Sequence, residues 1–170
     1  MKLFAGTLTN FKLDSKGRLS IPTKWRERLG KEFYMVAVTV KGCQCIALYP
    51  TEEFEKLYES TLNGNSENQR YASKKELLSK TEEATMDAQG RLTLNQRLKE
   101  MAFLKNDSDI IYQGNGDCVE IWDPEQHRKM ESTFDPNVGL YDIMDRANGI
   151  RQPEETNQKP ADLSTKGLDD

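Results

Sequence analysis

The spacing of hydrophobic and polar positions predicts both strands and short helices in this chain. Phe11 and Leu13 alternate with Lys12, as in a strand that buries one face. Two later stretches are rich in β-branched and aromatic residues, which favour strands. The first part of the chain is therefore expected to contain strands over residues 4–13, 18–21, 33–40 and 45–49.

A helix is predicted between the second and third of these strands. Pro22 suits the first turn of a helix, where its missing N–H is not needed, and Gly30 suits the end. Trp25 and Leu29 lie four residues apart and form an apolar face. Three basic side chains are then expected to reach solvent: Lys24, Arg26 and Arg28.

The same plan occurs twice along the chain. Asp-Ser-Lys-Gly-Arg at residues 14–18 returns as Asp-Ala-Gln-Gly-Arg at residues 87–91, an offset of 73 residues that also aligns Cys45 with Cys118. An internal repeat indicates one supersecondary unit built twice. Each copy is too short to bury a large core alone, so the two are expected to pack together. The second copy should contain strands ending at 86 and over 91–94, 109–112 and 118–122, with a helix that Asn95 caps and that runs to Met101.

Helical segments are expected after each copy. Thr51 opens one, Gly64 ends it, and residues 66–79 form a polar helix; Pro124 opens another, and residues 138–144 form a last helical turn or two. The predicted layout is a first unit at 4–52, linking helices at 53–76, a second unit at 77–125, a C-terminal helical segment at 126–147 and a disordered polar tail at 148–170.

The repeated motif predicts a tight turn in each copy. A carboxylate at the first position, Asp14 or Asp87, accepts backbone N–H bonds within a turn. A glycine at the fourth, Gly17 or Gly90, adopts a positive φ. This spacing fits a type I turn with a glycine bulge, which predicts a hairpin between the strands on either side.

Charge separates the two copies. Residues 1–31 carry eight Lys or Arg against two acids, a net +6, whereas residues 74–104 carry six against five, a net +1. The whole chain is at −4. A basic first unit in an acidic protein favours a directed contact with a polyanion. The alternative is an ordinary solvated basic surface.

Residues for catalysis or metal binding are not apparent in the sequence. The single histidine, His127, is expected on a solvated helix face. Cys43 and Cys45 lack the four-ligand spacing of a structural zinc site, and the equivalence of Cys45 with Cys118 indicates strand core instead. With no phosphate loop or nucleophile elbow, neither an enzyme, a cofactor, a metal nor a small-molecule substrate is expected.

The location is expected to be the cytoplasm. No apolar run approaches the roughly 20 residues of a membrane helix, and Thr7, Thr9 and Asn10 interrupt the apolar start that a signal peptide needs. Three cysteines cannot all pair within one chain, which is consistent with a reducing compartment.

Four segments together resemble the MraZ family of bacterial regulators, encoded in the division and cell-wall gene cluster. They are residues 14–22, Leu48-Tyr49-Pro50, residues 87–91 and Glu120-Ile121-Trp122. The resemblance implies an α+β fold of two tandem AbrB-like (double-split β-barrel) units in a pseudo-twofold arrangement with flanking helices. It also implies a ring-shaped homo-oligomer in the nucleoid that binds double-stranded DNA near its own promoter, with the motif arginine on the DNA.

Two departures from the family pattern affect the second copy. Asn95 replaces the proline of the motif, and Leu77 and Ser79 replace the Phe-x-Gly start seen at Phe4 and Gly6. Both departures bear more on DNA contact by the second copy than on its fold.

A hairpin tip is narrow enough to enter the major groove of DNA, which admits a two-stranded ribbon. Lys16 and Arg18 project from the first tip, and flanking cations can hold phosphates. The predicted DNA-binding set is Arg18, Lys16, Lys12, Lys24, Arg26, Arg28 and Arg91. Arg18 has an alternative role as a structural bridge to Asp14, and Arg91 has the same alternative with Asp87.

A rival interpretation is a protein-interaction or structural module that binds no nucleic acid. Tandem β units with an acidic surface could bind protein alone. The charge difference between the copies favours DNA, because a symmetric scaffold has no need of it.

Overall fold

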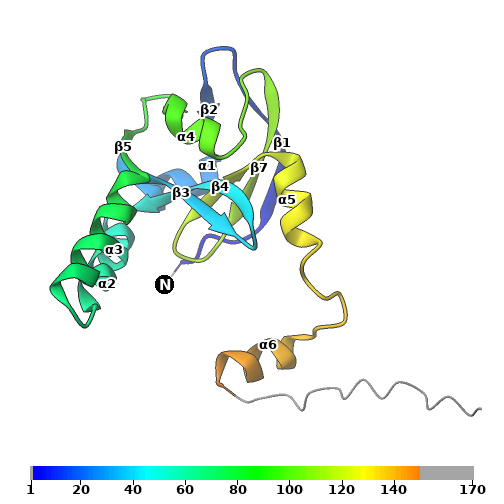
Figure 1. Ribbon diagram of the computed structural model, residues 1–170. Coiled ribbons are helices and arrows are strands. Elements are labelled where there is room, and N and C mark those ends of the chain that lie inside the picture. The colour runs from blue at the N-terminus through cyan, green and yellow to red at the C-terminus, as the bar shows by residue number, and fades with distance from the viewer. Residues whose placement is uncertain (1, 150–170) are drawn as a thin grey trace, which may run out of the picture. The chain divides into compact units, whose positions relative to one another are not determined.

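The computed structural model describes residues 2–149 (Figure 1). Two compact units divide the chain, the first up to Thr133 and the second from Phe134. The first unit contains both repeats, and the second contains helix α6 (Leu140–Ala147). The end of the predicted tail, residues 150–170, lies outside the described residues. No helix within 2–149 is both long and apolar enough for a membrane span.

Each repeat contributes four strands and one helix, and the structure is α+β. The first repeat contains β1 (Thr7–Leu13), β2 (Arg18–Ser20), α1 (Thr23–Leu29), β3 (Glu32–Val40) and β4 (Cys43–Pro50). The second contains β5 (Thr81–Thr85), β6 (Arg91–Thr93), α4 (Gln96–Met101), β7 (Ser108–Gly114) and β8 (Val119–Trp122). Helices α2 (Thr51–Ser60) and α3 (Glu67–Ser79), with the short 3₁₀ turn η1 (Thr61–Asn63) between them, link the repeats, and α5 (Pro124–Glu131) follows the second.

Several predicted helix boundaries are confirmed. Helix α1 begins after Pro22 and ends at Gly30, which has a φ of +82°. Helix α4 is capped by Asn95, whose side chain accepts the Leu98 N–H at 3.2 Å. The two repeats thus start equivalent helices by different local means.

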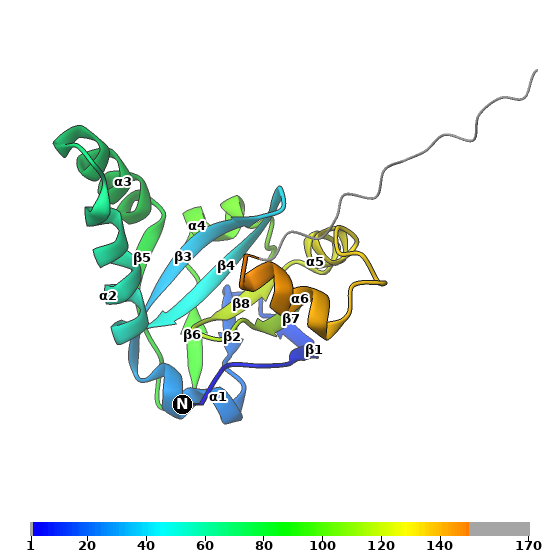
Figure 2. The ribbon, with the colours of Figure 1, turned by 90° about the horizontal axis from the view of Figure 1, so that it is seen from below.

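The strands of the two repeats are exchanged within one antiparallel sheet. The order is β1-β7-β8-β4-β3-β5, so β1 of the first repeat pairs with β7 of the second, and β5 of the second pairs with β3 of the first. The offset of 73 residues converts each of these pairings into the other. The sheet is open, with β1 and β5 at its edges (Figures 1 and 2).

The predicted hairpin within each repeat is wrong in one respect. Strand β2 does not form a ladder with β1; it pairs with β6 in a separate two-stranded ribbon, in which Leu19 lies opposite Leu92. Both leucines are buried. Pairing with the other repeat places the two leucines opposite each other in a common core.

One hydrophobic core contains side chains from both repeats. Equivalent residues of the two copies are buried in it, including Leu19, Ile21, Leu92 and Leu94. Trp25 packs edge-on against Tyr112 of the second repeat, with ring centroids 6.3 Å apart. Each buried leucine contributes about 1.5–3 kcal/mol, and in this structure the cluster that buries them contains residues of both repeats.

A second pair of equivalent residues meets where β4 and β8 run side by side. Ala47 lies opposite Glu120, and both are buried. The Glu120 carboxylate accepts the Trp122 Nε1–H at 3.2 Å. Burial raises the pKa of Glu120 above its ordinary value, and the bond from Trp122 partly opposes that shift.

Each turn of one repeat is also bonded to the other repeat. The Ile21 N–H donates to the Gly90 carbonyl at 2.8 Å, and the equivalent Leu94 N–H donates to the Gly17 carbonyl at 2.9 Å. The Arg26 guanidinium lies against Gly90 and donates from Nε to the Ile21 carbonyl at 2.8 Å. Helix α1 thereby supports the turn of the second repeat.

Because the core is shared, both repeats should unfold together. Trp25 reports on the first repeat and Trp122 on the second, so Trp122→Phe and Trp25→Phe each leave one probe. We expect the fluorescence midpoint in urea to coincide with the far-ultraviolet circular dichroism midpoint in both variants. Midpoints that separate in either variant would show that the repeats are independent.

Gly90→Ala should destabilise the protein more than Gly42→Ala. Both glycines have a φ of +76°, so both substitutions incur the left-handed penalty of about 1–2 kcal/mol. At Gly90 a Cβ would also lie 2.2 Å from Arg26 Cζ, whereas nothing lies within 4 Å at Gly42. We expect at least about 1 kcal/mol of additional loss in urea unfolding at Gly90, from overpacking. Arg26→Ala in the same chain should remove that difference; equal costs at the two glycines would contradict the contact.

Candidate nucleic-acid interface

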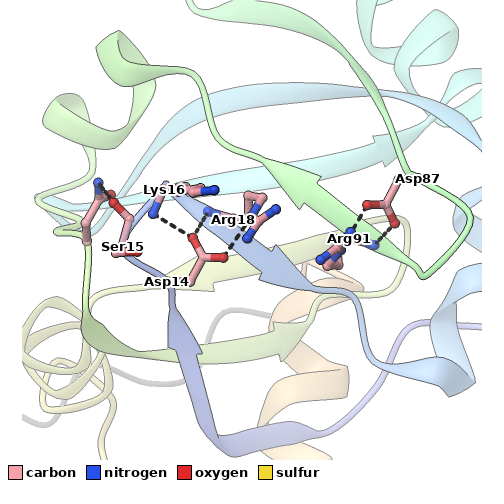
Figure 3. Close-up of polar contacts among 7 residues, drawn as sticks. Asp14, Ser15, Lys16, Arg18, Asp87 and Arg91 are labelled. Carbon is pink, nitrogen blue, oxygen red and sulfur yellow. Dashed lines mark hydrogen bonds and ion pairs between the residues drawn. The ribbon is translucent and has the colours of Figure 1, made fainter.

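The first turn is organised by one carboxylate, as predicted. Asp14 Oδ1 accepts the backbone N–H groups of Lys16 and Arg18, each at 2.8 Å (Figure 3). The Gly17 N–H donates to the Asp14 carbonyl at 3.1 Å, and Gly17 has a φ of +73°. Asp14 thereby holds the turn through three backbone N–H groups, those of Lys16, Gly17 and Arg18.

The second turn repeats this geometry. Asp87 Oδ1 accepts the backbone N–H groups of Gln89 and Arg91, each at 2.9 Å, and Gly90 has a φ of +76°. The structural roles predicted for Asp87 and Gly90 match those of their counterparts in the first turn.

Both motif arginines bridge to the aspartate of their own turn. The distance from Arg18 Nε to Asp14 Oδ2 is 2.9 Å, and the equivalent distance from Arg91 Nε to Asp87 Oδ2 is also 2.9 Å (Figure 3). Neither arginine uses its terminal Nη groups for a contact within residues 2–149. The bridge therefore orients each guanidinium and leaves its outer donors available.

The same contacts change the acidity of the two aspartates. The backbone N–H of Arg18 lowers the pKa of Asp14, assisted by the Arg18 side chain and the Lys16 N–H, while partial burial opposes them. Asp87 has a lowered pKa for equivalent reasons, with Arg91 and Gln89 as donors. A lowered folded-state pKa contributes stability that is present above the unfolded value, about 4, and is lost as the pH falls through the folded value. Both turns thus keep a charged carboxylate at neutral pH.

The ribbon of β2 and β6 brings the two arginines onto one surface. Arg18 lies opposite Thr93, and Ser20 lies opposite Arg91. Alternation along a strand places these four side chains on one face and Leu19 and Leu92 on the other, buried face. Two residues along a strand and one strand across separate the Cα atoms of the arginines by about 8 Å. Figure 3 shows them on adjacent strands.

Two further lysines lie near the first turn. The equivalent positions of the second repeat are uncharged. Lys16 is exposed at the tip, and its counterpart is Gln89. Lys12 is exposed on β1, with its ammonium 3.9 Å from Asp109, and its counterpart is Thr85. At these two positions the first repeat has a lysine where the second has an uncharged residue.

The predicted helix cations differ in exposure. Lys24 is exposed, with its ammonium 4.8 Å from the Trp25 ring centroid. The expectation that Arg26 and Arg28 reach solvent is confirmed only in part, since both are half-buried. Arg26 lies against Gly90, and Arg28 donates to the Gly116 carbonyl at 2.7 Å and lies 4.0 Å above the Phe4 ring. Their stems and donors are used for packing the two repeats together.

A pair of residues that the motif analysis did not single out also reaches the first turn. Lys99, from α4, donates from Nζ to Asn106 Oδ1 at 2.8 Å, and Asn106 Nδ2 donates to the Ser15 carbonyl at 3.2 Å. The sequence contained one indication of Lys99: it is equivalent to Arg26 under the repeat offset of 73 residues.

The residues considered for chemistry are packing residues. The expected solvated position of His127 is wrong: it is 5% exposed, with Nε2 3.3 Å from Gln113 Oε1 and its ring edge-on to Trp122. Cys45 and Cys118 are both buried, as predicted; Cys45 is in β4, whereas Cys118 lies one residue before β8. Burial raises the pKa of the Cys118 thiol to about 12. Within 2–149, no three His, Cys, Asp or Glu side chains are grouped to hold a metal ion.

Comparison with known proteins places this sequence in a family. The family described as MraZ protein, antitoxin-like, matches residues 3–75 and 77–140, one match for each repeat. Two relatives share the name Transcriptional regulator MraZ. The one from Corynebacterium urealyticum is 38% identical over 142 residues, covering 82% of this chain and 94% of the relative. The one from Mycolicibacterium smegmatis is 35% identical over 136 residues, covering 79% and 91%. The chain belongs to the MraZ family.

Proposed function

We propose that this protein regulates transcription by binding double-stranded DNA through the outer face of the β2–β6 ribbon. The observation that carries the proposal is the position of Arg18 and Arg91 on one solvent-facing surface, each oriented by its own aspartate. The names of the relatives, transcriptional regulators, support the same role.

A two-stranded ribbon has the width that the major groove admits. An arginine held through Nε keeps two Nη donors for guanine O6 and N7, the pairing that best distinguishes guanine from other bases. Ser20 and Thr93 lie on the same face and carry hydroxyls that can donate to or accept from base edges. The face therefore contains two arginines that can recognise guanine and two hydroxyls that can hydrogen-bond to several bases.

The exposed lysines of the first repeat are suited to phosphate contact. Lys12 and Lys16 are exposed at the first turn, and Lys24 is exposed on α1, the helix that packs against the second turn. Phosphate contacts hold a protein in register without specifying sequence, and ammonium groups serve well as point charges. Arg26 and Arg28 are also in the predicted DNA-binding set. Their DNA contact stays a prediction, and their hydrogen bonds to backbone carbonyls within the chain argue against it.

The wider role follows from the family. We infer that the target is the promoter of the division and cell-wall gene cluster, that the protein acts in the cytoplasm at the nucleoid, and that each repeat is an AbrB-like unit. The exchange of β1 and β5 between the repeats supports the last point, since neither unit completes its sheet alone.

We also propose that several copies assemble, as a ring, on direct repeats in the DNA. One ribbon with a few phosphate contacts binds weakly at physiological salt, and linked copies raise the effective concentration of each further unit. Helix α3 buries no residue in the single chain, and Tyr71 and Leu78 on it are exposed. Such apolar side chains are suited to contacts between copies.

Arg18→Ala should weaken binding to the DNA upstream of the protein's own gene without unfolding the protein. Loss of a bidentate base contact corresponds to about 1–3 kcal/mol, or about 5–150-fold, at each ribbon. Arg91→Ala should have a smaller effect, because its turn has Gln89 at the position of Lys16. Gel shifts and thermal melts of both variants would measure this. Arg128→Ala, which removes an exposed charge from α5, is the control.

If Arg18→Ala lowers the melting temperature while each folded molecule retains full affinity, the arginine is only a structural bridge. In that case the protein-interaction module becomes the better interpretation.

Binding should depend steeply on the number of DNA repeats. We expect an oligomer larger than a dimer by light scattering, and direct repeats spaced by about one helical turn, ~10 base pairs. Affinity should collapse on reduction to a single repeat. The slope of log affinity against log salt should grow with repeat number, by roughly 0.9 per phosphate neutralised. A monomer, or equal affinity for one repeat and three, would contradict assembly on DNA.

A further inference from the structure

Lys99 is a buried cation whose contacts lead to the first turn. It belongs to α4 of the second repeat, and only 6% of the residue is exposed. Its ammonium donates to Asn106 Oδ1 at 2.8 Å, and the Asn106 amide in turn donates to the Ser15 carbonyl at 3.2 Å. The next residue, Asp107, donates its N–H to the Asp14 carbonyl at 3.4 Å.

The ammonium also lies directly over the backbone of the turn. A Cβ at Gly17 would be 2.8 Å from Lys99 Nζ, so the absence of a side chain there makes room for the cation. Burying an ammonium is costly unless hydrogen bonds compensate it. Within 2–149, no carboxylate forms an ion pair with Lys99, and its hydrogen-bond acceptor is the amide of Asn106. Core packing alone would be served better by an apolar side chain at this position.

The equivalent arrangement at the second turn is simpler. Arg26 occupies the position of Lys99 and lies against Gly90, but it donates to the Ile21 carbonyl, within its own repeat. The position equivalent to Asn106 is Phe33, a buried core residue. Within residues 2–149, the first turn therefore has a polar connection from the opposite helix to the carbonyl of its second residue, Ser15, and the second turn has no equivalent.

We propose that Lys99 and Asn106 are positioning residues for DNA binding: they hold the first turn, and with it Lys16 and Arg18, in the geometry that reaches DNA. They act through the turn and do not contact DNA. The inference rests on the proposed function, because it assigns the second repeat a part in how the first repeat binds. It requires that loss of either residue reduce specificity without removing a phosphate contact.

Two variants test this in the full-length protein. Lys99→Met removes the ammonium and keeps the length of the stem; Asn106→Ala breaks the connection and keeps the charge of Lys99. In the free protein, both should speed hydrogen exchange at the Lys16 and Gly17 amides. With a duplex from upstream of the gene, both should bind about tenfold more weakly, as expected for a misplaced base contact, and a shuffled duplex of equal length should be little affected.

The salt dependence separates positioning from direct contact. A lysine that neutralises a phosphate lowers the slope of log affinity against log salt by about 0.9 when removed, whereas a positioning residue leaves the slope unchanged. Lys105→Met is the matched control, since Lys105 is an exposed lysine one residue before Asn106 and, within residues 2–149, forms no hydrogen bond or ion pair with the turn. It should leave exchange at the turn and the preference for the upstream duplex unchanged.

A reduced slope for Lys99→Met would overturn the proposal in favour of a phosphate contact. Unchanged exchange and unchanged preference in both variants would show that the pair has no role at the turn. If the wild-type protein itself does not prefer the upstream duplex over the shuffled one, the proposed function fails. The exchange rates would still decide whether Lys99 and Asn106 hold the turn.

Discussion

The structure depends on pairing between the repeats, because two strands of each repeat, β1 and β2 in the first and β5 and β6 in the second, pair with strands of the other repeat. Strands β2 and β6 have three residues each, too few to be stable alone, and their central leucines face each other across the ribbon. The edge strands β1 and β5 pair only with strands of the other repeat. Folding of either repeat is therefore tied to folding of the other, and the surface of the ribbon exists only once both have formed.

The candidate interface combines local and long-range control. Each arginine receives its orientation from an aspartate four residues earlier, a contact that needs nothing outside the turn. The distance between Arg18 and Arg91 is set by the register of β2 with β6, which is a contact between repeats. The two turns can therefore differ in charge while the ribbon keeps its geometry. Lys16 and Gln89, at equivalent positions of the two turns, are an example.

Local features were predictable from the sequence and long-range ones were not. The turn at Asp14, the helix cap at Asn95 and the end of α1 at Gly30 each follow from hydrogen bonds or backbone angles within a few residues. The pairing of β2 with β6 could not be deduced, because a glycine-bulge turn fits a local hairpin equally well. His127 was misassigned for a related reason: the charged residues around it indicated solvent, while its neighbours Trp122 and Gln113 come from strands that fold beneath α5.

The same reasoning applies to the basic residues of α1. Helical periodicity separates Trp25 from Arg26 and Arg28, but it does not show that a glycine of the other repeat lies within reach of Arg26. Long cationic side chains bury their stems where backbone is left uncovered, so their exposure depends on distant packing. The repeat offset nevertheless contained usable information, because it equated Arg26 with Lys99 and so pointed to a shared role at the two turns.

The meeting of Ala47 and Glu120 has a consequence for self-complementarity. In a symmetric homodimer of a single repeat, the residue on the twofold axis must face its own copy. Two alanines there would leave unfilled space, and two glutamates would bury two carboxylates against each other. Joining the repeats in one chain lifts that restriction, so a small side chain can face a large polar one that hydrogen-bonds to Trp122. Covalent linkage thus makes asymmetric solutions available at a position where symmetry would forbid them.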